Sequence, residues 1–556
     1  MEKYRLISID PIETKIPKYV YERLEDIIWD EIYKTGNPEQ ALEPYIFPFE
    51  NIQKIAESDK IEYKENVRDM ADDIWNKEVW LDAVIVYYIL MHIITFMPND
   101  FYKMGYALAK LKYQDLGEQL IEVYKTASPN KKIMYHAVAN YYYCATDTPY
   151  KAIEYFEKYI EIDDTKANVF VSLGHLYGKI DDLVSKEKQL NAYLKAYELK
   201  PDDGTIIKSL LTAYEKAHNI EKVKEFYPKL IEVMPSPKHS LNYGLYLMSW
   251  GNFQEGYKYF TERFDLDEYP IGYPKGILNG TNKWNYNEDI SDKTLIVHYE
   301  EGYGDSIMYG RFLPLISQYA RKTILIIQPQ LVNLFKQSEK ISDNIAIYGD
   351  IKEYLSEKSQ ERIIHIPLMD TPYPLGMDSH FIPYSHGYLS AKTPVKFDNN
   401  KINIGIAYSG DLSANYNGRD IGVNEFFPIA ELSDKIQLYS LQVGEATEQL
   451  KYLPDNINII DLGKDFSDFT DTANAIAGLD LVITSDNVIL NLAGALGKRT
   501  YAIFNKYPNY RWFDLSGENV IWYESVKPFQ CEEENNWKSV IEKVKQNLLK
   551  EPGLIG

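Results

Sequence analysis

The hydrophobic periodicity of this chain changes near Phe264, and that change restricts the possible folds more than any other feature of the sequence. Before Phe264, apolar residues recur at the three- and four-residue spacing of amphipathic helices. After it, short apolar runs of the β type alternate with helical stretches. With 556 residues, the chain is also too long for one hydrophobic core. The sequence therefore predicts a helical region followed by α/β domains.

The helical region is a series of similar helix pairs. One pair lies between Pro201 and Pro235, a spacing close to the ~34-residue period of tetratricopeptide (TPR) repeats. Gly174 and Gly256 are expected where two helices approach closely. The acidic pairs of this region are expected at turns or helix caps, and they are Asp163–Asp164, Asp181–Asp182 and Asp202–Asp203. Such an array binds a protein or supports a neighbouring domain.

Aromatic and polar residues of the inner helices suggest a face that binds an extended polypeptide. Repeat arrays display the inner helix of each pair on a concave surface. We expect that surface to include Tyr141, Tyr142, Tyr177 and Tyr214, beside Asn140 and His175. Packing of these tyrosines between helices is the alternative interpretation.

The most apolar run of the chain, Trp80 to Pro98, needs a separate interpretation. It contains Asp82 and His92 and is shorter than the ~20 apolar residues of a membrane span. We therefore predict no transmembrane span, and a helix buried on most sides within the array. An exposed contact in a homo-oligomer is the second interpretation.

Charge and cysteine content exclude other classes of protein. With 82 acidic and 60 basic residues the net charge is −22, and a field of that sign repels nucleic-acid phosphates. We expect no nonspecific nucleic-acid binding. Cys144 and Cys531 are too few for a disulfide framework or a cysteine-based metal site. The first residues, MEKYRLISIDPIETK, lack the apolar core of a signal peptide, so a cytoplasmic location is predicted.

The part after Phe264 contains nine predicted strands in two sets, divided around Thr393 to Asn403. Short apolar strands that alternate with helices form parallel sheets covered on both faces. Two doubly wound domains that face each other would form a cleft at the carboxyl ends of their strands. The strands are predicted at 294–299, 323–327, 345–348, 362–366, 402–408, 436–441, 457–460, 479–484 and 500–504.

Polar clusters follow several of these strands. Gly302, Gly304 and Asp305 stand between the first strand and a helix, where glycine permits a sharp turn and a close approach to a ligand. An ordinary strand-to-helix turn is the alternative. In TSDNVILNLAGALGK we predict Asp486 as the N-cap and Gly497 as the stop of a helix over 487–496. Further clusters are YSGDLSANYNGRD, SLQVGE and FNKYPNYRW.

Several segments match one family in the same order along the chain. They include DKTLIVHYEEGYGDSIMYGRFLP, IPLMDTPYPLGM, IAYSGDLSANYNGRD and DLGKDFSDFTDTANAIAGLDLVITSDNVILNLAGALGK. From about Asn242 to Trp512, the sequence resembles the bacterial TPR-linked glycosyltransferases of the GT-B fold. The relatives of that family include the heptosyltransferases and, more remotely, the protein O-N-acetylglucosaminyltransferases.

The resemblance implies an N-terminal helical TPR-like solenoid followed by two facing Rossmann-like α/β domains, with no metal and no other cofactor. The implied divisions are a helical or irregular region at 1–75, TPR-like repeats at 76–268, an acceptor-side half at 269–398 and a nucleotide-sugar half at 399–556. The donor would be a nucleotide-diphosphate-sugar. The acceptor would be a protein or a glycan held by the array.

The resemblance also implies roles for individual residues. Asp305 would be the general base that takes the proton of the acceptor hydroxyl. Arg419, with Ser409 and Gly410, would contact the donor phosphates, and Gln442 would lie at the edge of the nucleoside. The segment Ser485, Asp486 and Asn487 would form the phosphate-holding helix start. Asp468 and Thr472 would lie near the nucleoside or ribose.

Two departures from the family's pattern bear on activity. Asn491 stands where the family usually has a histidine, and Val443 stands where a lysine is common. Asn491 cannot titrate, and Val443 offers no charge to a phosphate. The sequence therefore predicts a metal-independent glycosyltransferase of the hexosyl- or heptosyltransferase class. An inactive transferase-like scaffold, in which the array recruits a partner protein or an active transferase, is the alternative. The sugar and the acceptor stay open.

Overall fold

The computed structural model describes residues 11–13, 15–34, 61–146, 148–180, 182–217, 219–266, 282–357, 362–378, 382–397, 400–410, 419–506, 508, 511–513 and 520–550. The chain forms two compact units, Met1–Met234 and Pro235–Gly556. The boundary lies before the last predicted helix pair, which the sequence had grouped with the array.

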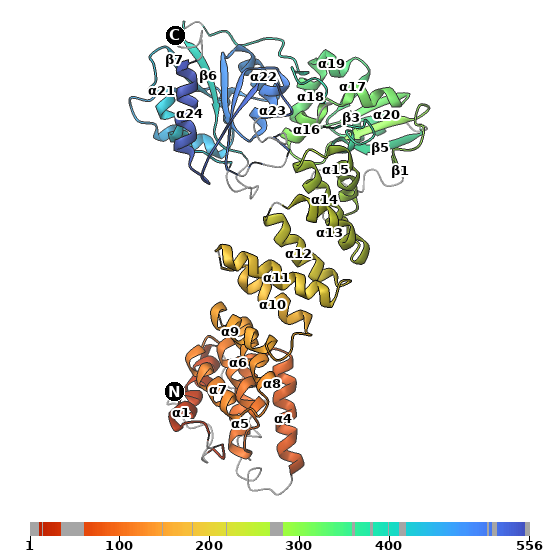
Figure 1. Cartoon of the computed structure of the whole chain (residues 1–556). Helices are drawn as coiled ribbons and strands as arrows, with labels where there is room; N and C mark the ends of the chain where they lie inside the picture. The colour runs from red at the N-terminus through yellow and green to blue at the C-terminus, as the bar shows by residue number, and fades with distance from the viewer. Residues whose placement is uncertain are drawn as a thin grey trace. The chain divides into compact units, whose positions relative to one another are not determined.

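The first unit consists of helices (Figure 1). Their bounds are α1 Lys18–Lys34, α4 Ile61–Asn76, α5 Trp80–Ile93, α6 Pro98–Lys110, α7 Gln114–Ala127, α8 Lys131–Asn140 with the π-helical turn η2 Tyr141–Ala145, α9 Pro149–Ile160, α10 Ala167–Tyr177, α11 Leu183–Leu199, α12 Gly204–Lys216 and α13 Ile220–Val233. From α6 onward they pack in consecutive pairs. The first helices of successive pairs begin at Pro98, Lys131, Ala167 and Gly204, which gives repeats of 33, 36 and 37 residues. This spacing and pairing confirm the TPR-like helical repeats.

Short polar residues begin several of these helices, as the sequence predicted. Asp182 Oδ1 accepts a hydrogen bond from Ser185 N at 2.9 Å, and Asp203 Oδ1 accepts one from Thr205 N at 3.0 Å. Within one pair, a Cβ atom on Gly174 would lie 2.3 Å from the ring of Tyr193. The prediction that Gly174 marks a close helix contact is confirmed.

Helix α5 is the centre of the N-terminal core. Every residue from Ala83 to Ile93 is buried, and α1, α4 and α6 pack around the helix. The loop before α1 is attached to it, because Ile12 N and Glu13 N donate to Met91 O at 3.0 and 3.1 Å. The predicted buried helix is confirmed. Among the described residues, no helix combines the length and apolar character needed to cross a membrane.

The proposed aromatic concave face is not formed as expected. Tyr141, Tyr142, Tyr177 and Tyr214 are each at most 7% exposed and belong to the space between helices. The alternative interpretation, packing between helices, is correct for these four side chains, because the apolar ring gains more from burial than from exposure. Of the two polar residues, His175 is exposed and Asn140 is partly buried.

The second unit begins with the helix pair α14 (Pro237–Ser249) and α15 (Phe253–Phe260), which ends in the 3₁₀ turn η3 (Thr261–Asp265). A Cβ atom on Gly256 would lie 2.5 Å from Met248 Cγ and 2.9 Å from Gly244 O, so the predicted close contact at Gly256 is also confirmed. Tyr257 and Phe260 share one hydrophobic core with the first sheet of this unit.

The first sheet is parallel and has the strand order β4-β3-β2-β5-β1. Its elements are β1 Asn282–Lys283, β2 Thr294–His298, α16 Tyr303–Gly310, α17 Leu313–Ile316, η4 Ser317–Tyr319, β3 Lys322–Ile326, α18 Pro329–Gln337, α19 Glu339–Ser342, β4 Ile345–Tyr348, α20 Ile351–Glu357, β5 Ile363–Pro367 and η5 Leu368–Asp370. Ile296 and Ile324 pack towards α20, whereas Leu295, Val297 and Leu325 pack on the opposite face, where α16 and α18 lie.

The second sheet is also parallel, with the order β8-β7-β6-β9-β10-β11. This is the order of the dinucleotide-binding doubly wound fold. Its elements are β6 Ile402–Ala407, η6 Val423–Phe426, α21 Phe427–Ala430, β7 Ile436–Ser440, η7 Glu445–Tyr452, β8 Ile459–Asp461, η8 Gly463–Asp465, α22 Phe469–Gly478, β9 Leu481–Ser485, α23 Val488–Ala495, β10 Thr500–Phe504, β11 Val526–Gln530 and α24 Trp537–Lys550. All nine predicted strands are present, whereas β1 and β11 were not predicted.

The two sheets are joined by one hydrophobic core. Alternate residues of β9 face opposite ways, with Val482 in the core shared with the first sheet and Ile483 in the core beneath α24. Helices α16 and α18 of the first half contact α23 and α22 of the second. The strand order reverses between β2 and β5 and between β6 and β9, and ligands of such folds bind at these switch points.

Candidate functional site

The candidate site lies where α16 and α23 begin, at the carboxyl ends of β2 and β9. A Cβ atom on Gly304 would lie 3.1 Å from Asn491 Nδ2, so a larger residue would require the Asn491 side chain to shift by a few tenths of an ångström. The close approach of a ligand at Gly304 stays a prediction. Gly302 has an ordinary φ of −67° and is the residue before α16, so no strained turn requires it.

Asp305 lies in the first turn of α16 and faces the other half of the unit. Its Oδ1 accepts a short hydrogen bond from Arg511 Nη1, and the two side chains are 20% and 19% exposed. Arg511 follows β10 and is held by its neighbours, since Trp522 Nε1 donates to Arg511 O at 2.6 Å. Arg511 belongs to the polar cluster FNKYPNYRW, but the sequence did not predict a role for this residue.

Asp486 and Arg419 form the second ion pair of the site. Arg419 Nε lies 3.4 Å from Asp486 Oδ2, with the side chains 30% and 13% exposed. Burial raises the pKa of the Asp486 carboxyl, Arg419 and Arg511 lower it, and Asp305 raises it again. The site therefore has a second cation, Arg511, beside the predicted Arg419.

The predicted N-cap at Asp486 is wrong by one residue. Asn487 is the cap of α23, and its Oδ1 accepts from Ile489 N at 2.9 Å. The helix covers Val488–Ala495 instead of 487–496. Its predicted stop is confirmed, because Gly497 has a φ of +68° and Lys498 N donates to Ala493 O at 2.9 Å, as in a Schellman motif.

Ser409 and Gly410 follow the carboxyl end of β6, and Gln442 follows that of the neighbouring strand β7. Gln442 Oε1 accepts from Ser409 N at 3.1 Å, and the Gln442 side chain is buried. Asp420 Oδ1 accepts from Ser409 Oγ at 2.6 Å and from Gly410 N at 3.1 Å. These bonds fix the backbone beside the site, and residues 411–418 of the predicted polar loop lie outside the described residues.

Asp468 connects the two halves. Its Oδ1 accepts from Thr470 N at 2.7 Å as the cap of α22, and its Oδ2 accepts from Asn333 Nδ2 of α18 at 2.8 Å. Burial acts to raise the pKa of Asp468, but these hydrogen bonds bring it below its usual value. Thr472, one turn further on, is buried.

The remaining predicted residues form a small network at the start of α23. Ser485 Oγ accepts from Asn487 Nδ2 at 3.2 Å. Asn491 Oδ1 accepts from Tyr523 OH at 3.1 Å, and the Asn491 side chain is 6% exposed. Asn491 therefore takes part in packing at the place where the family has a histidine.

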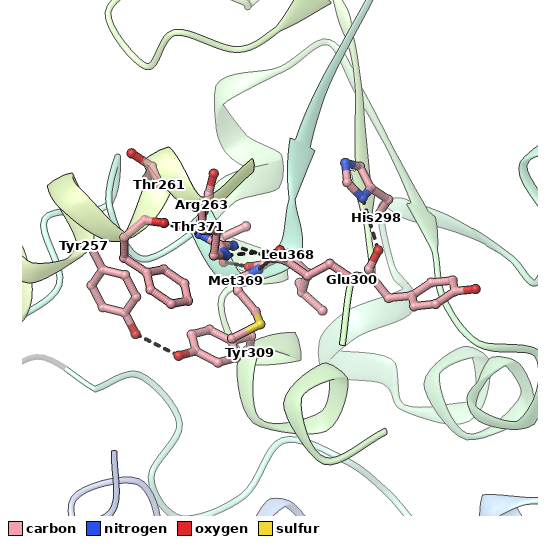
Figure 2. A network of polar contacts seen from close by, with 12 residues as sticks. Tyr257, Thr261, Arg263, His298, Glu300, Tyr309, Leu368, Met369 and Thr371 are labelled. Carbon is pink, nitrogen blue, oxygen red and sulfur yellow. Dashed lines mark hydrogen bonds and ion pairs between the residues drawn. The ribbon is translucent and has the colours of Figure 1, made fainter. Parts of the chain in front are cut away.

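A buried charge cluster involves the loop between β2 and α16, and sequence reasoning missed it (Figure 2). Arg263 of η3 donates from Nη2 to Glu300 Oε1 and from Nη1 to Asp370 Oδ1, both at 2.5 Å. All three side chains are at most 1% exposed. Tyr286 OH donates to Asp370 Oδ2 at 2.7 Å, and Lys283 Nζ lies 3.1 Å from the same oxygen. The cluster ties the last helix pair to the loops after β2 and β5.

Histidines complete the surroundings of this cluster. His298 Nε2 lies 3.2 Å from His365 Nδ1. Burial lowers the pKa of His298 to about 3 and that of His365 to about 4, so both rings are neutral at physiological pH. Within the described ranges, no group of three or more histidine, cysteine, aspartate or glutamate side chains is arranged to hold a metal.

The chain has limited sequence similarity to known proteins. No protein-family model matches the chain. Protein FlbA of Caulobacter vibrioides is 23% identical over 328 residues, which cover 54% of this chain and 52% of FlbA. The chain thus matches about half the length of that relative.

Solved structures match the chain over less than a third of its length. MamA from Desulfovibrio magneticus is 17% identical, with 31% of this chain and 97% of MamA covered and a TM-score of 0.28. YrrB, described as a TPR protein with an unusual peptide-binding site, is 14% identical over 31% of this chain and 88% of YrrB, with a TM-score of 0.26. Scores at this level carry no argument, so the description of the repeats rests on the helices themselves.

Proposed function

We propose that this protein is a glycosyltransferase of the GT-B type, which moves a sugar from a nucleotide-diphosphate-sugar to an acceptor hydroxyl without a metal. One observation carries the proposal. Two parallel, doubly wound sheets of one compact unit bring Asp305, Asp486, Arg419 and Arg511 together beside their switch points. Carboxylates and guanidiniums at that place are the groups that deprotonation of a hydroxyl and departure of a diphosphate require.

The proposed reaction is a displacement at the anomeric carbon. Asp305 accepts the proton of the acceptor hydroxyl while the hydroxyl oxygen attacks that carbon. The bond from the anomeric carbon to the phosphate oxygen breaks, and the electron pair leaves with the nucleoside diphosphate. The guanidinium of Arg419 balances the charge of the departing diphosphate. Glu300 and Arg263 hold the loop of Asp305 in place from behind.

The helical array would bind a protein acceptor. The four buried tyrosines do not support this part of the proposal. A line of partly exposed polar groups across three successive helix pairs does. Tyr143 OH lies 3.2 Å from His175 Nδ1, and His175 Nε2 lies 3.5 Å from Ser209 Oγ. Hydroxyl and imidazole groups of this kind bind the polar backbone of an extended chain.

A second candidate function is the inactive scaffold. Two observations favour it. Val443, where lysine is common in the family, is 54% exposed. Asn491, where the family usually has histidine, accepts a hydrogen bond from Tyr523 within the protein. A scaffold of this kind would keep the fold and recruit a partner through the array.

A screen of nucleotide-sugars separates the two candidates. We expect one of the UDP-, GDP- or ADP-linked sugars to raise the melting temperature, because a ligand that binds the native state stabilises it by mass action. The Arg419→Gln variant should lose that rise, whereas Arg321→Gln, at the opposite end of β3, should keep it. No rise with any nucleotide-sugar would favour the scaffold.

A further inference from the structure

The two guanidiniums of the candidate site are already occupied by carboxylates of the protein. Arg511 contacts Asp305, and Arg419 contacts Asp486. The electrostatic effects of both arginines and of Asp305 reach Asp486, so the four groups form one cluster. Its formal charges are two negative and two positive, and they cancel.

This cluster differs from the buried cluster around Arg263 in its access to solvent. Arg263, Glu300 and Asp370 are at most 1% exposed and are completed by hydrogen bonds within the protein. In contrast, Arg419 is 30% exposed, and Arg511 and Asp305 are about one-fifth exposed. An ion pair with solvent access can exchange partners, because water and ligands reach its charged atoms. The exposed cluster is therefore suited to exchange, and the buried one to a fixed structural role.

A further donor lies at the same place. Trp512 is 1% exposed, and its indole Nε1–H forms no hydrogen bond of good geometry among the described residues. Its hydrogen-bonding interaction with Asp486 lowers the pKa of that carboxyl. An N–H group beside two guanidiniums suits an anionic ligand.

We propose that Arg511 is the second ligand of the donor's diphosphate, and that Asp305 and Asp486 are internal anions which hold the two arginines until the diphosphate replaces them. The inference rests on the proposed function. It states which groups of the protein bind the two arginines before the donor does. Two guanidiniums and the Trp512 N–H then face two phosphoryl groups, which accept hydrogen bonds with bidentate geometry. Exchange of Arg511 also releases Asp305 Oδ1 for the acceptor hydroxyl, so the donor binds before the acceptor is activated.

Exchange of the arginines should change the protonation of Asp486. Asp486 is faced by Arg419, Arg511, Asp305 and the Trp512 indole. When the diphosphate binds the two arginines, Asp486 loses its neighbouring cations. The carboxyl remains buried and is still repelled by Asp305. Its carboxylate then takes up a proton, because burial without a cation favours the neutral form. Binding of the diphosphate should therefore take up protons and become tighter as pH falls.

Calorimetry on the full chain tests the exchange, with UDP, GDP, ADP and inorganic pyrophosphate as probes. The variant Arg511→Gln should weaken binding by ~10- to 100-fold, as expected for the loss of a charge-assisted contact. Asp486→Asn should tighten binding at pH 7.5 by ~3-fold or more, because the competing anion is removed. It should also abolish proton uptake, measured in buffers of different ionisation enthalpy.

The controls are Arg321→Gln and Asp434→Asn, which make the same changes at the amino-terminal ends of strands. Asp305→Asn is a second test of Arg511, because it removes the charge of the carboxylate that pairs with Arg511. This variant should keep or increase the affinity for the diphosphate. Normal binding by Arg511→Gln, or weaker binding by an Asp486→Asn variant of normal melting temperature, overturns the inference and leaves the proposed function intact. If the wild-type chain binds none of the probes, the proposed function fails and the inference fails with it.

Discussion

Arg263 is the residue on which the loop of Asp305 depends most. Its guanidinium is buried between Glu300 and Asp370 and also donates to Phe260 O at 2.8 Å. A buried cation of this kind stabilises the fold only while its partners are present, because each unpaired charge costs several kcal/mol in the interior. Glu300 is five residues before Asp305, so the contact that holds Glu300 also fixes the loop that leads into α16.

Arg263→Leu should lower the free energy of unfolding by ~3–5 kcal/mol, because two buried carboxylates lose their shared cation. Urea denaturation followed by circular dichroism measures the change. Arg321→Leu is the matched control and should change the free energy of unfolding little, since Arg321 is exposed at the start of β3. Equal stability of the two variants would show that the buried cluster does not stabilise the unit.

The pH dependence of stability should contain a contribution from Glu300. Burial raises the pKa of Glu300 to about 7 from its ordinary 4.5, despite the opposing effect of Arg263. The folded chain therefore holds a proton that the unfolded chain releases, so the Glu300 contribution is greatest below pH 4.5 and is lost as pH rises towards 7. Between pH 5.5 and 7.5, the free energy of unfolding of the wild type relative to Glu300→Gln should fall by ~1 kcal/mol or more.

The comparison with Glu300→Gln removes the contributions common to both proteins, including that of Asp370, whose pKa is shifted down by Arg263 and Lys283 against the effect of burial. Glu534→Gln, an exposed substitution, serves as the control. A wild-type stability that stays level relative to Glu300→Gln over this range would mean that Glu300 is ionised throughout and would contradict the prediction.

Among the elements, α14 and α15 pack closely against each other. A Cβ atom on Gly244 would lie 2.6 Å from Gly256 O and 2.8 Å from Phe260 N, which are backbone atoms and cannot rotate away. Tyr257 of the same pair donates to Tyr309 OH of α16 at 3.1 Å. The pair is therefore a structural part of the α/β unit as well as a helical repeat.

Gly244→Ala should lower the free energy of unfolding by ~1–3 kcal/mol, because the methyl group forces α14 and α15 apart. Thermal and urea denaturation measure the effect. Gly349→Ala is a suitable control, since its Cβ atom would meet the nearest atom at 3.4 Å, an ordinary contact. If both variants are equally stable, the close approach at Gly244 is not a constraint.

Most elements could be predicted from the sequence because they have strong local signals. The strands are short apolar runs, and Gly497 and Asp182 are typical helix-end residues. β1, with two residues, and β11, with Pro528 inside it, have no such signal. The cap of α23 was misplaced because Asp486 and Asn487 are equally good caps, and only the path of the chain decides between them.

The site was harder to predict than the elements. Gly304 and Asp305 were found because they follow a predicted strand. The partners of the charged residues were not found, because the Asp305–Arg511 contact joins residues that are 206 positions apart. Arg263, Glu300 and Asp370 were missed for the same reason, since a charged residue in a sequence is normally expected at the surface. The roles of Ser409, Gly410, Gln442, Asp468 and Thr472 towards a donor remain predictions.

At the scale of the whole molecule, the compact-unit boundary at Met234 and Pro235 separates the repeats from the candidate site. All of the charged groups discussed above, from Arg263 to Arg511, belong to the second unit. Under the proposed function, acceptor recognition would belong to the first unit and donor chemistry to the second. Helices α14 and α15 belong to the second unit, together with the candidate site.

Two fragments test this division. A fragment that begins at Pro235 should fold and bind nucleoside diphosphates like the full chain, but should lose transfer to a protein acceptor. A fragment that begins at residue 269 lacks Arg263 and should not fold, because Glu300 and Asp370 would be buried without their cation. Circular dichroism and calorimetry measure both properties. Normal transfer by the first fragment would contradict acceptor binding by the repeats, and normal folding of the second would contradict the role of α14 and α15.

The most direct test of the proposed glycosyl transfer is the rate of nucleoside diphosphate release from the nucleotide-sugar that stabilises the protein, measured with its acceptor. The wild type should release the diphosphate and glycosylate the acceptor. Asp305→Asn should bind the donor but transfer the sugar at least ~10²-fold more slowly, because the hydroxyl loses its general base. Asp434→Asn should behave as the wild type. Equal rates for wild type and Asp305→Asn, or no release with any nucleotide-sugar, would contradict the account.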